Sequence, residues 1–149
     1  MRCLIVEDDN FKLERIRATI ERDCPLLDAS TANSVGSAIR QIGSESYDLI
    51  VLDMALPSHD LKAGGAPPSS LLSGGIEVIM ELSFLEREDP VVVMTQYPEI
   101  EIDGLFVSIS AADERLRNLC QFNLQTVIQY KHDSSVWESD LRSILRQLG

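Results

Sequence analysis

The fold is decided by the stretch Tyr47-Asp48-Leu49-Ile50-Val51-Leu52-Asp53-Met54-Ala55-Leu56-Pro57. Its four consecutive apolar residues, 49–52, are bounded by polar and turn residues, which predicts a short strand buried on both faces. Asp53 then lies at the carboxyl end of this strand, and Pro57 keeps the segment that follows from continuing as regular structure. Ligands bind at this edge in open α/β sheets. Asp53 is therefore a candidate site residue, although a lone acid here is also typical of a simple turn cap.

Other short apolar runs end in the same way. The run 3–6 is followed by Glu7-Asp8-Asp9 and the run 91–94 by Thr95, and a last expected strand, 126–130, is followed by Lys131. Taken alone, the acids suit a solvated helix start, where carboxylates favour the helix dipole, and Thr95 suits a cap of the next segment. A polar or charged residue directly after each of several expected strands favours one common site.

Helical spacing of apolar residues separates these runs. It predicts helices over residues 10–22, with Asn10 as the cap, and over 34–43, 76–85 and 111–121. A capping-box pattern at 135–138 opens a final helix that buries Trp137. With a weak strand at 27–31, strands and helices alternate five times, which predicts a parallel sheet with helices on both faces.

Strand ends of a parallel sheet meet at one edge, so Glu7-Asp8, Asp53, Thr95 and Lys131 are expected to lie close together. Three neighbouring carboxylates repel unless a cation neutralises them, and oxygen ligands of this kind suit Mg²⁺, which favours phosphate as a co-ligand. A carboxylate beside a hard cation, a hydroxyl and a lysine is suited to forming an aspartyl phosphate.

Two irregular stretches interrupt the alternation, at about 59–74 and 98–110. The first is rich in Gly-Gly, Pro-Pro and Ser-Ser pairs and is long for a compact domain, which is typical of a functional or mobile loop. The second alternates around Asp103-Gly104, which predicts a hairpin.

The length, charge and cysteine content of the chain argue against membrane-spanning, secreted and nucleic-acid-binding proteins. A chain of 149 residues with a 44% hydrophobic share is expected to form one domain, 1–149, without a membrane span or signal peptide. The formal charge of −11 opposes direct binding to nucleic acid or anionic membrane. Three scattered cysteines, Cys3, Cys24 and Cys120, favour reduced thiols and a cytoplasmic location.

These motifs resemble a stand-alone response-regulator receiver domain, the phosphoacceptor of two-component signalling. The resemblance rests on the runs ending in Glu7-Asp8-Asp9, Asp53 and Thr95, together with Lys131, and it covers about 1–58, 74–97 and 111–149. It implies a flavodoxin-like (CheY-like) five-stranded parallel sheet of order 2-1-3-4-5. It also implies phosphorelay from a sensor histidine kinase or phosphotransfer protein to an unknown downstream protein.

Carried onto this sequence, the resemblance makes Asp53 the phosphoacceptor. Asp8 would ligate Mg²⁺ directly, Glu7 through water, and the carbonyl of Ala55 would add a further ligand beside Asp53. A receiver of this kind catalyses its own phosphorylation but is not a turnover enzyme.

The remaining family roles fall on two residues. Thr95 would donate its hydroxyl to a phosphoryl oxygen, and Lys131 would pair first with Asp53 and then with the phosphoryl group. We expect no output domain after the final helix, so any signal would pass through protein contacts, and a homodimer is compatible with this hypothesis.

Three departures from the family pattern concern the output. His132 replaces the usual proline after the lysine, Ile128 replaces the usual aromatic switch residue, and both irregular stretches are longer than usual. We therefore predict that 97–110, together with 59–74, forms the partner surface.

Two alternatives from other classes stay open. A haloacid-dehalogenase-like phosphohydrolase also uses an aspartate at a strand end, but that family requires a second aspartate at the position where this chain has Ala55. A receiver-like interaction module that never accepts phosphate would keep the fold without the chemistry.

Overall fold

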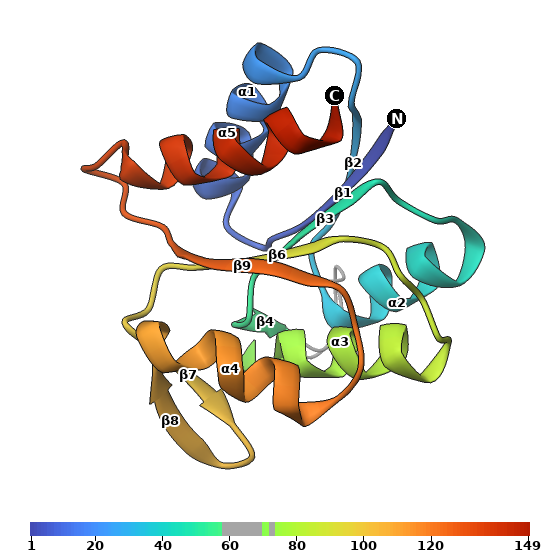
Figure 1. Cartoon of the computed structure of the whole chain (residues 1–149), viewed down its shortest axis with the longest axis vertical. Helices are drawn as coiled ribbons and strands as arrows, with labels where there is room; N and C mark the ends of the chain where they lie inside the picture. Colours follow the sequence, from blue (N-terminus) through green and yellow to red (C-terminus); the bar gives the residue numbers. More distant parts are fainter. Residues whose placement is uncertain (58–69, 72–73) are drawn as a thin grey trace, which may run out of the picture.

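Five parallel strands form the central sheet, in the order β2-β1-β3-β6-β9 (Figure 1). The computed structural model describes residues 1–57, 70–71 and 74–149. Counted among themselves, the strands follow the flavodoxin-like order 2-1-3-4-5, which confirms the predicted fold class. Their bounds are β1 (Arg2–Val6), β2 (Asp28–Ala32), β3 (Leu49–Leu52), β6 (Val91–Thr95) and β9 (Leu124–Gln129).

Helices cover both faces of the sheet (Figure 1). On one face lie α1 (Asn10–Asp23) and α5 (Val136–Leu148), and on the other α2 (Val35–Ser44), α3 (Gly74–Phe84) and α4 (Ile109–Leu119). Each face has its own cluster of buried apolar side chains, as expected when parallel strands are covered on both sides. None of the helices among the described residues is long and apolar enough to cross a membrane.

The starts of α1 and α3 differ from the sequence-based expectation, and α4 begins at Ile109 rather than at residue 111. Asp9, not Asn10, caps α1, because its carboxylate accepts a hydrogen bond from the backbone N–H of Lys12 at 3.0 Å. Gly74 and Gly75 belong to α3, although their glycine pair predicted loop. A Cβ on either would lie 2.7 Å from a backbone oxygen of the segment after β3, so this close approach needs glycine.

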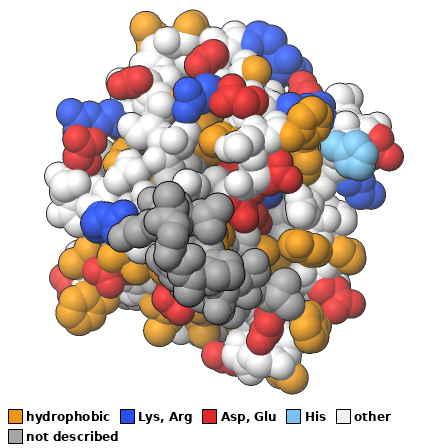
Figure 2. Space-filling model, turned by 180° about the vertical axis from the view of Figure 1, so that it is seen from behind, with side chains coloured by type: hydrophobic (Ala, Val, Ile, Leu, Met, Phe, Trp, Pro, Cys, Tyr) orange, Lys and Arg blue, Asp and Glu red, His pale blue; other side chains and the backbone are white. Residues whose placement is uncertain are grey.

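The predicted hairpin at 98–110 is present. Strands β7 (Glu99–Ile102) and β8 (Leu105–Ser108) pair antiparallel around Asp103 and Gly104, whose φ angles are both positive, at 52° and 76°. Ile100 and Ile102 turn into the core, whereas Leu105 and Phe106 stay more than half exposed. In Figure 2, hydrophobic side chains (orange) reach the surface at the lower right, where this hairpin lies in the reversed view.

Most of the other irregular stretch, 59–74, lies outside the described residues. Within it, β5 (Ser70–Leu71) pairs antiparallel with β4 (Leu56–Pro57). Pro57 thus ends a two-residue strand of its own, paired outside the central sheet, where a proline at a strand edge is tolerated.

Candidate functional site

Three carboxylates lie at the carboxyl edge of the sheet. Glu7 directly follows β1 and Asp53 directly follows β3, and these two strands pair in parallel with Val6 opposite Leu52. One oxygen from each of Glu7, Asp8 and Asp53 lies within 4.8 Å of the others. The parallel register therefore brings together the three acids that the sequence assigned to one site.

Burial shapes the charge of this cluster. Glu7 and Asp53 are only 2% and 4% exposed, whereas Asp8 is exposed. Burial, together with the nearby charge of Asp53, raises the pKa of Glu7 to about 8. Burial also raises the pKa of Asp53, although Lys12 opposes this shift. The two buried acids thus resist being ionised together unless positive charge is supplied.

The segment after Asp53 is held against α3. The backbone N–H of Ala55 donates to Asp53 Oδ1 at 3.3 Å, and the N–H of Gly75 donates to the carbonyl of Met54 at 2.9 Å. The close packing of Gly75 on this segment leaves no room for a side chain. The first turn of α3 therefore holds the backbone that carries Asp53 in place.

Thr95 ends β6 and leads into the hairpin. Its side chain is buried, and its hydroxyl accepts a hydrogen bond from the N–H of Tyr97 at 3.2 Å. Thr95 and Met54 also line a pocket of about 330 Å³, and Phe106 of the hairpin is among its other lining residues. A displacement of the Thr95 hydroxyl would therefore break its hydrogen bond to Tyr97 in the segment that leads into β7 and β8.

The fourth predicted strand-end group is Lys131, which lies two residues after the end of β9. Its side chain is exposed, and among the described residues no ion pair joins it to Asp53. Side chains alternate at a strand end, and here Tyr130 is the residue that points inward, packing on Trp137 with ring centroids 5.0 Å apart. Arg15 fixes this arrangement by donating to the carbonyl of His132 at 2.7 Å. The described part of the chain thus contains no Lys131–Asp53 ion pair, and the predicted role of Lys131 stays a prediction; the Lys131–His132 peptide is trans.

Lys12, from the first turn of α1, takes the place next to the acids. Its ammonium nitrogen lies 2.6 Å from Glu7 Oε2 and 3.6 Å from Asp53 Oδ1, and the side chain is 1% exposed. It also donates to the carbonyl of Met94 at 3.0 Å and lies 5.6 Å from the centre of the Tyr130 ring. One buried cation therefore joins the ends of β1, β3 and β6.

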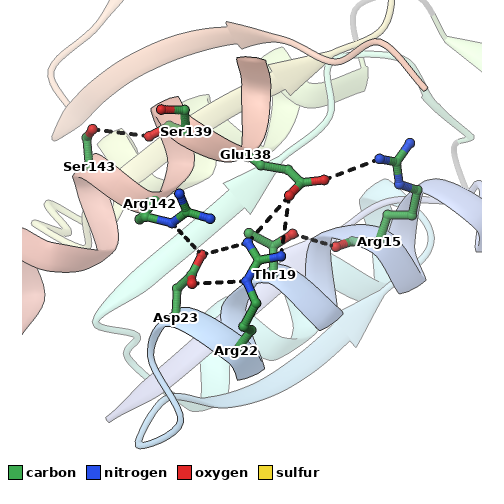
Figure 3. Close-up of polar contacts among 8 residues, drawn as sticks. All are labelled: Arg15, Thr19, Arg22, Asp23, Glu138, Ser139, Arg142 and Ser143. Carbon is green, nitrogen blue, oxygen red and sulfur yellow. Dashed lines mark hydrogen bonds and ion pairs between the residues drawn. The ribbon is translucent and has the colours of Figure 1, made fainter. Parts of the chain in front are cut away.

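The position of Lys12 depends on how α1 is held. Figure 3 shows the polar contacts between α1 and α5: Glu138 binds Arg15 and Arg22, and Asp23 binds Arg22 and Arg142. Partly exposed ion pairs of this kind are individually weak, but four of them around two carboxylates form a network. Together with the buried apolar contacts between the helices, they set the rotation of α1 that points Lys12 at the sheet edge.

Sequence reasoning missed Lys12, although a signal was present. Lys12 stands four residues before Ile16 and eight before Ile20, on the helical stripe that α1 buries. A charged residue on a buried stripe requires a buried partner, because an unpaired buried charge is costly. The acids that precede the helix are the nearest candidates.

The donor set fits a hard divalent cation. Three carboxylates within 4.8 Å, one of them open to solvent, offer the oxygen ligands that Mg²⁺ binds while keeping several waters. Lys12 lies against Glu7 and Oδ1 of Asp53, which leaves Asp8 and the other oxygen of Asp53 for a metal. The predicted role of the Ala55 carbonyl stays a prediction.

Comparison with known proteins places this geometry in context. No protein-family model matches the chain. The chain is 32% identical over 149 residues to the Detocs response regulatory protein DtcB of Vibrio alginolyticus, covering 96% of this chain and 98% of that protein. In structure it resembles a Francisella response-regulator receiver domain, with a TM-score of 0.66, 20% identity and coverage of 99% and 94% of the two chains. It also resembles the response regulator TrrA of Thermotoga maritima in complex with Mg²⁺ and BeF, with a TM-score of 0.65, 16% identity and coverage of 99% and 98%.

Proposed function

Because the chain belongs to the response-regulator family that includes DtcB, with the fold of a receiver domain, we propose that it accepts a phosphoryl group on Asp53. The donor would be a phosphohistidine of a sensor kinase or a phosphotransfer protein. The observation that carries the proposal is the cluster of Glu7, Asp8 and Asp53 at one sheet edge, with one acid exposed and two buried.

The reaction is a transfer between two nucleophiles. A carboxylate oxygen of Asp53 attacks the phosphorus, the P–N bond breaks, and the imidazole leaves with that electron pair, its other ring nitrogen carrying the proton. The carboxylate is held in line for attack by the N–H of Ala55 and by α3 through Gly75. When bound, Mg²⁺ would supply positive charge that offsets the carboxylates and the phosphoryl oxygens.

Thr95 supplies the link from phosphorylation to output. Its hydroxyl, now engaged with the N–H of Tyr97, would turn to donate to a phosphoryl oxygen on Asp53. The downstream partner would be a protein, in keeping with the charge of −11. Receiver domains generally act as signalling domains rather than as catalysts, and this chain is proposed to act in the same way.

Intact-mass measurement tests the proposal. Wild-type protein incubated with Mg²⁺ and phosphoramidate should gain the mass of one phosphoryl group, and Asp53→Asn should gain none. Asp28→Asn is the matched control, because Asp28 is an exposed acid at the opposite edge of the sheet. An unmodified wild type would instead support the phosphate-independent interaction module, and an equal gain in Asp53→Asn would show that the acceptor is elsewhere.

A further inference from the structure

Resting on the proposed function, we propose that Lys12 of α1, and not Lys131, supplies the cation that contacts the phosphoryl group on Asp53. The lysine of the site would then come from the first helix rather than from the last strand. Helix α1 becomes part of the reacting site instead of only a cover for the sheet.

The position of the Lys12 ammonium supports this assignment. Lys12 Nζ lies between Glu7 Oε2, at 2.6 Å, and Asp53 Oδ1, at 3.6 Å. The longer distance is that to the acceptor, so the ammonium can approach a phosphoryl oxygen on Asp53 while it keeps its contact with Glu7. Lys131 has no comparable place, because its side chain is exposed while Tyr130 occupies the inward position.

The burial of the Lys12 side chain also supports this assignment. At 1% exposure, Lys12 is among the most buried of the described side chains, and a buried lysine is costly unless it is paired. Glu7, Asp53 and the carbonyl of Met94 surround its ammonium, so these partners all belong to strand ends of the site. A lysine that served only packing would be replaced at lower cost by an apolar residue.

Contacts around the last strand explain why Lys131 is not available. Arg15 lies 5.8 Å from the centre of the Tyr130 ring, and Lys12 lies 5.6 Å from it. Arg15 also binds the carbonyl of His132, directly after Lys131. Tyr130 also packs on Trp137, so contacts with two cations and one ring hold it in the inward position next to the exposed Lys131.

The chemical role follows from the charge that develops. As phosphoramidate transfers its phosphoryl group, an oxygen of Asp53 bonds to phosphorus, the P–N bond breaks, and the protonated nitrogen leaves as ammonia with the electron pair. Negative charge spreads over the phosphoryl oxygens in this transfer. A preorganised, buried ammonium stabilises that charge better than a solvated one.

Two matched variants test the assignment. Lys12→Met and Lys131→Met remove the same ammonium from the two positions while keeping an unbranched side chain. With Mg²⁺ and phosphoramidate, we expect the phosphorylation rate to fall on the order of 100-fold in Lys12→Met, as for loss of one buried charge-stabilising donor, and to be unchanged in Lys131→Met. The reverse order, or equal rates in Lys12→Met and wild type, overturns the proposal.

Measurements on the folded protein distinguish a purely structural role of Lys12 from a direct contact with the phosphoryl group. Circular dichroism and the Mg²⁺ dissociation constant report whether Lys12→Met keeps its fold and metal site. In wild type, the side-chain ¹⁵N resonance of Lys12 should shift on addition of Mg²⁺ and beryllofluoride, whereas that of Lys131 should not. A shift confined to Lys131 overturns the proposal even if the Lys12 variant does not fold.

Failure of the two proposals can be told apart. If wild-type protein accepts no phosphoryl group, the proposed function fails and the assignment of Lys12 fails with it. If wild type is phosphorylated on Asp53 and Lys12→Met is phosphorylated equally fast, only the assignment of Lys12 fails.

Discussion

The ammonium of Lys12 donates a hydrogen bond of 3.0 Å to the carbonyl oxygen of Met94, 82 residues further along the chain. Met94 directly precedes Thr95, whose hydroxyl accepts from the N–H of Tyr97. A short series of contacts thus connects the acceptor Asp53 with the segment that enters the β7–β8 hairpin.

We expect this connection to reorder the hairpin when the site is occupied. Adding Mg²⁺ and beryllofluoride should change amide hydrogen exchange within residues 97–110, because Thr95 must release the N–H of Tyr97 to reach a phosphoryl oxygen. Thr95→Ala should abolish this change, and Thr126→Ala, a half-buried threonine of β9, should not. Protection changes confined to β9 and α5 would contradict the prediction.

Metal binding should depend on Asp8. In Asp8→Ala, the metal-free protein should melt at a higher temperature, because one of three neighbouring carboxylates is gone. Wild type at 100 times its Mg²⁺ dissociation constant should gain about 2.7 kcal/mol of stability, and the variant at the same concentration should gain little. Melts with and without Mg²⁺ test both effects, with Asp28→Asn as control; an equal metal-induced shift would show that Asp8 is not a ligand.

Stability without metal should fall as the pH rises. The pKa of Glu7 is raised from 4.5 to about 8, so the folded state holds a proton in this range that the unfolded state has released. Stability then decreases with rising pH between these two values. Urea unfolding across this range should show the loss in wild type and a flatter profile in Glu7→Gln, whereas Glu99→Gln, at an exposed position, should keep the wild-type profile.

The same titration predicts the pH dependence of the metal effect. Carboxylate ligands must be deprotonated to bind a cation, so Mg²⁺ should stabilise the protein more near the upper end of this range than near the lower end. A Mg²⁺ effect that weakens as the pH rises would contradict a buried, proton-holding Glu7 beside the metal site.

Gly75 should be intolerant of a side chain. Gly75→Ala places a Cβ 2.7 Å from the backbone oxygen of Asp53, so we expect a loss of about 1–3 kcal/mol of stability and slower phosphorylation. Gly43→Ala is the control, because nothing lies within 4 Å of its Cβ, and it should stabilise the protein by about 0.5–1 kcal/mol. Urea unfolding of both variants measures the difference. Equal stability of Gly75→Ala and Gly43→Ala would show that α3 can shift to make room for the added Cβ.

The sequence by itself determined the sheet and the three acids. Apolar runs bounded by Glu7 and Asp53 specify buried parallel strands, and parallel strands place their carboxyl ends at one edge whatever the details of packing. The hairpin around Asp103-Gly104 was equally predictable, because a two-residue turn with positive φ is a local preference.

Only the tertiary structure decided which lysine reaches the acids. Lys131 follows a strand in the sequence, but its direction depends on Tyr130 packing inward against Trp137 and on Arg15 holding His132. Lys12 reaches Asp53 because α1 is rotated by its packing on α5, through partners more than 100 residues away. A strand end fixes where a backbone stops, whereas the direction of a long side chain is set by contacts that no local pattern contains.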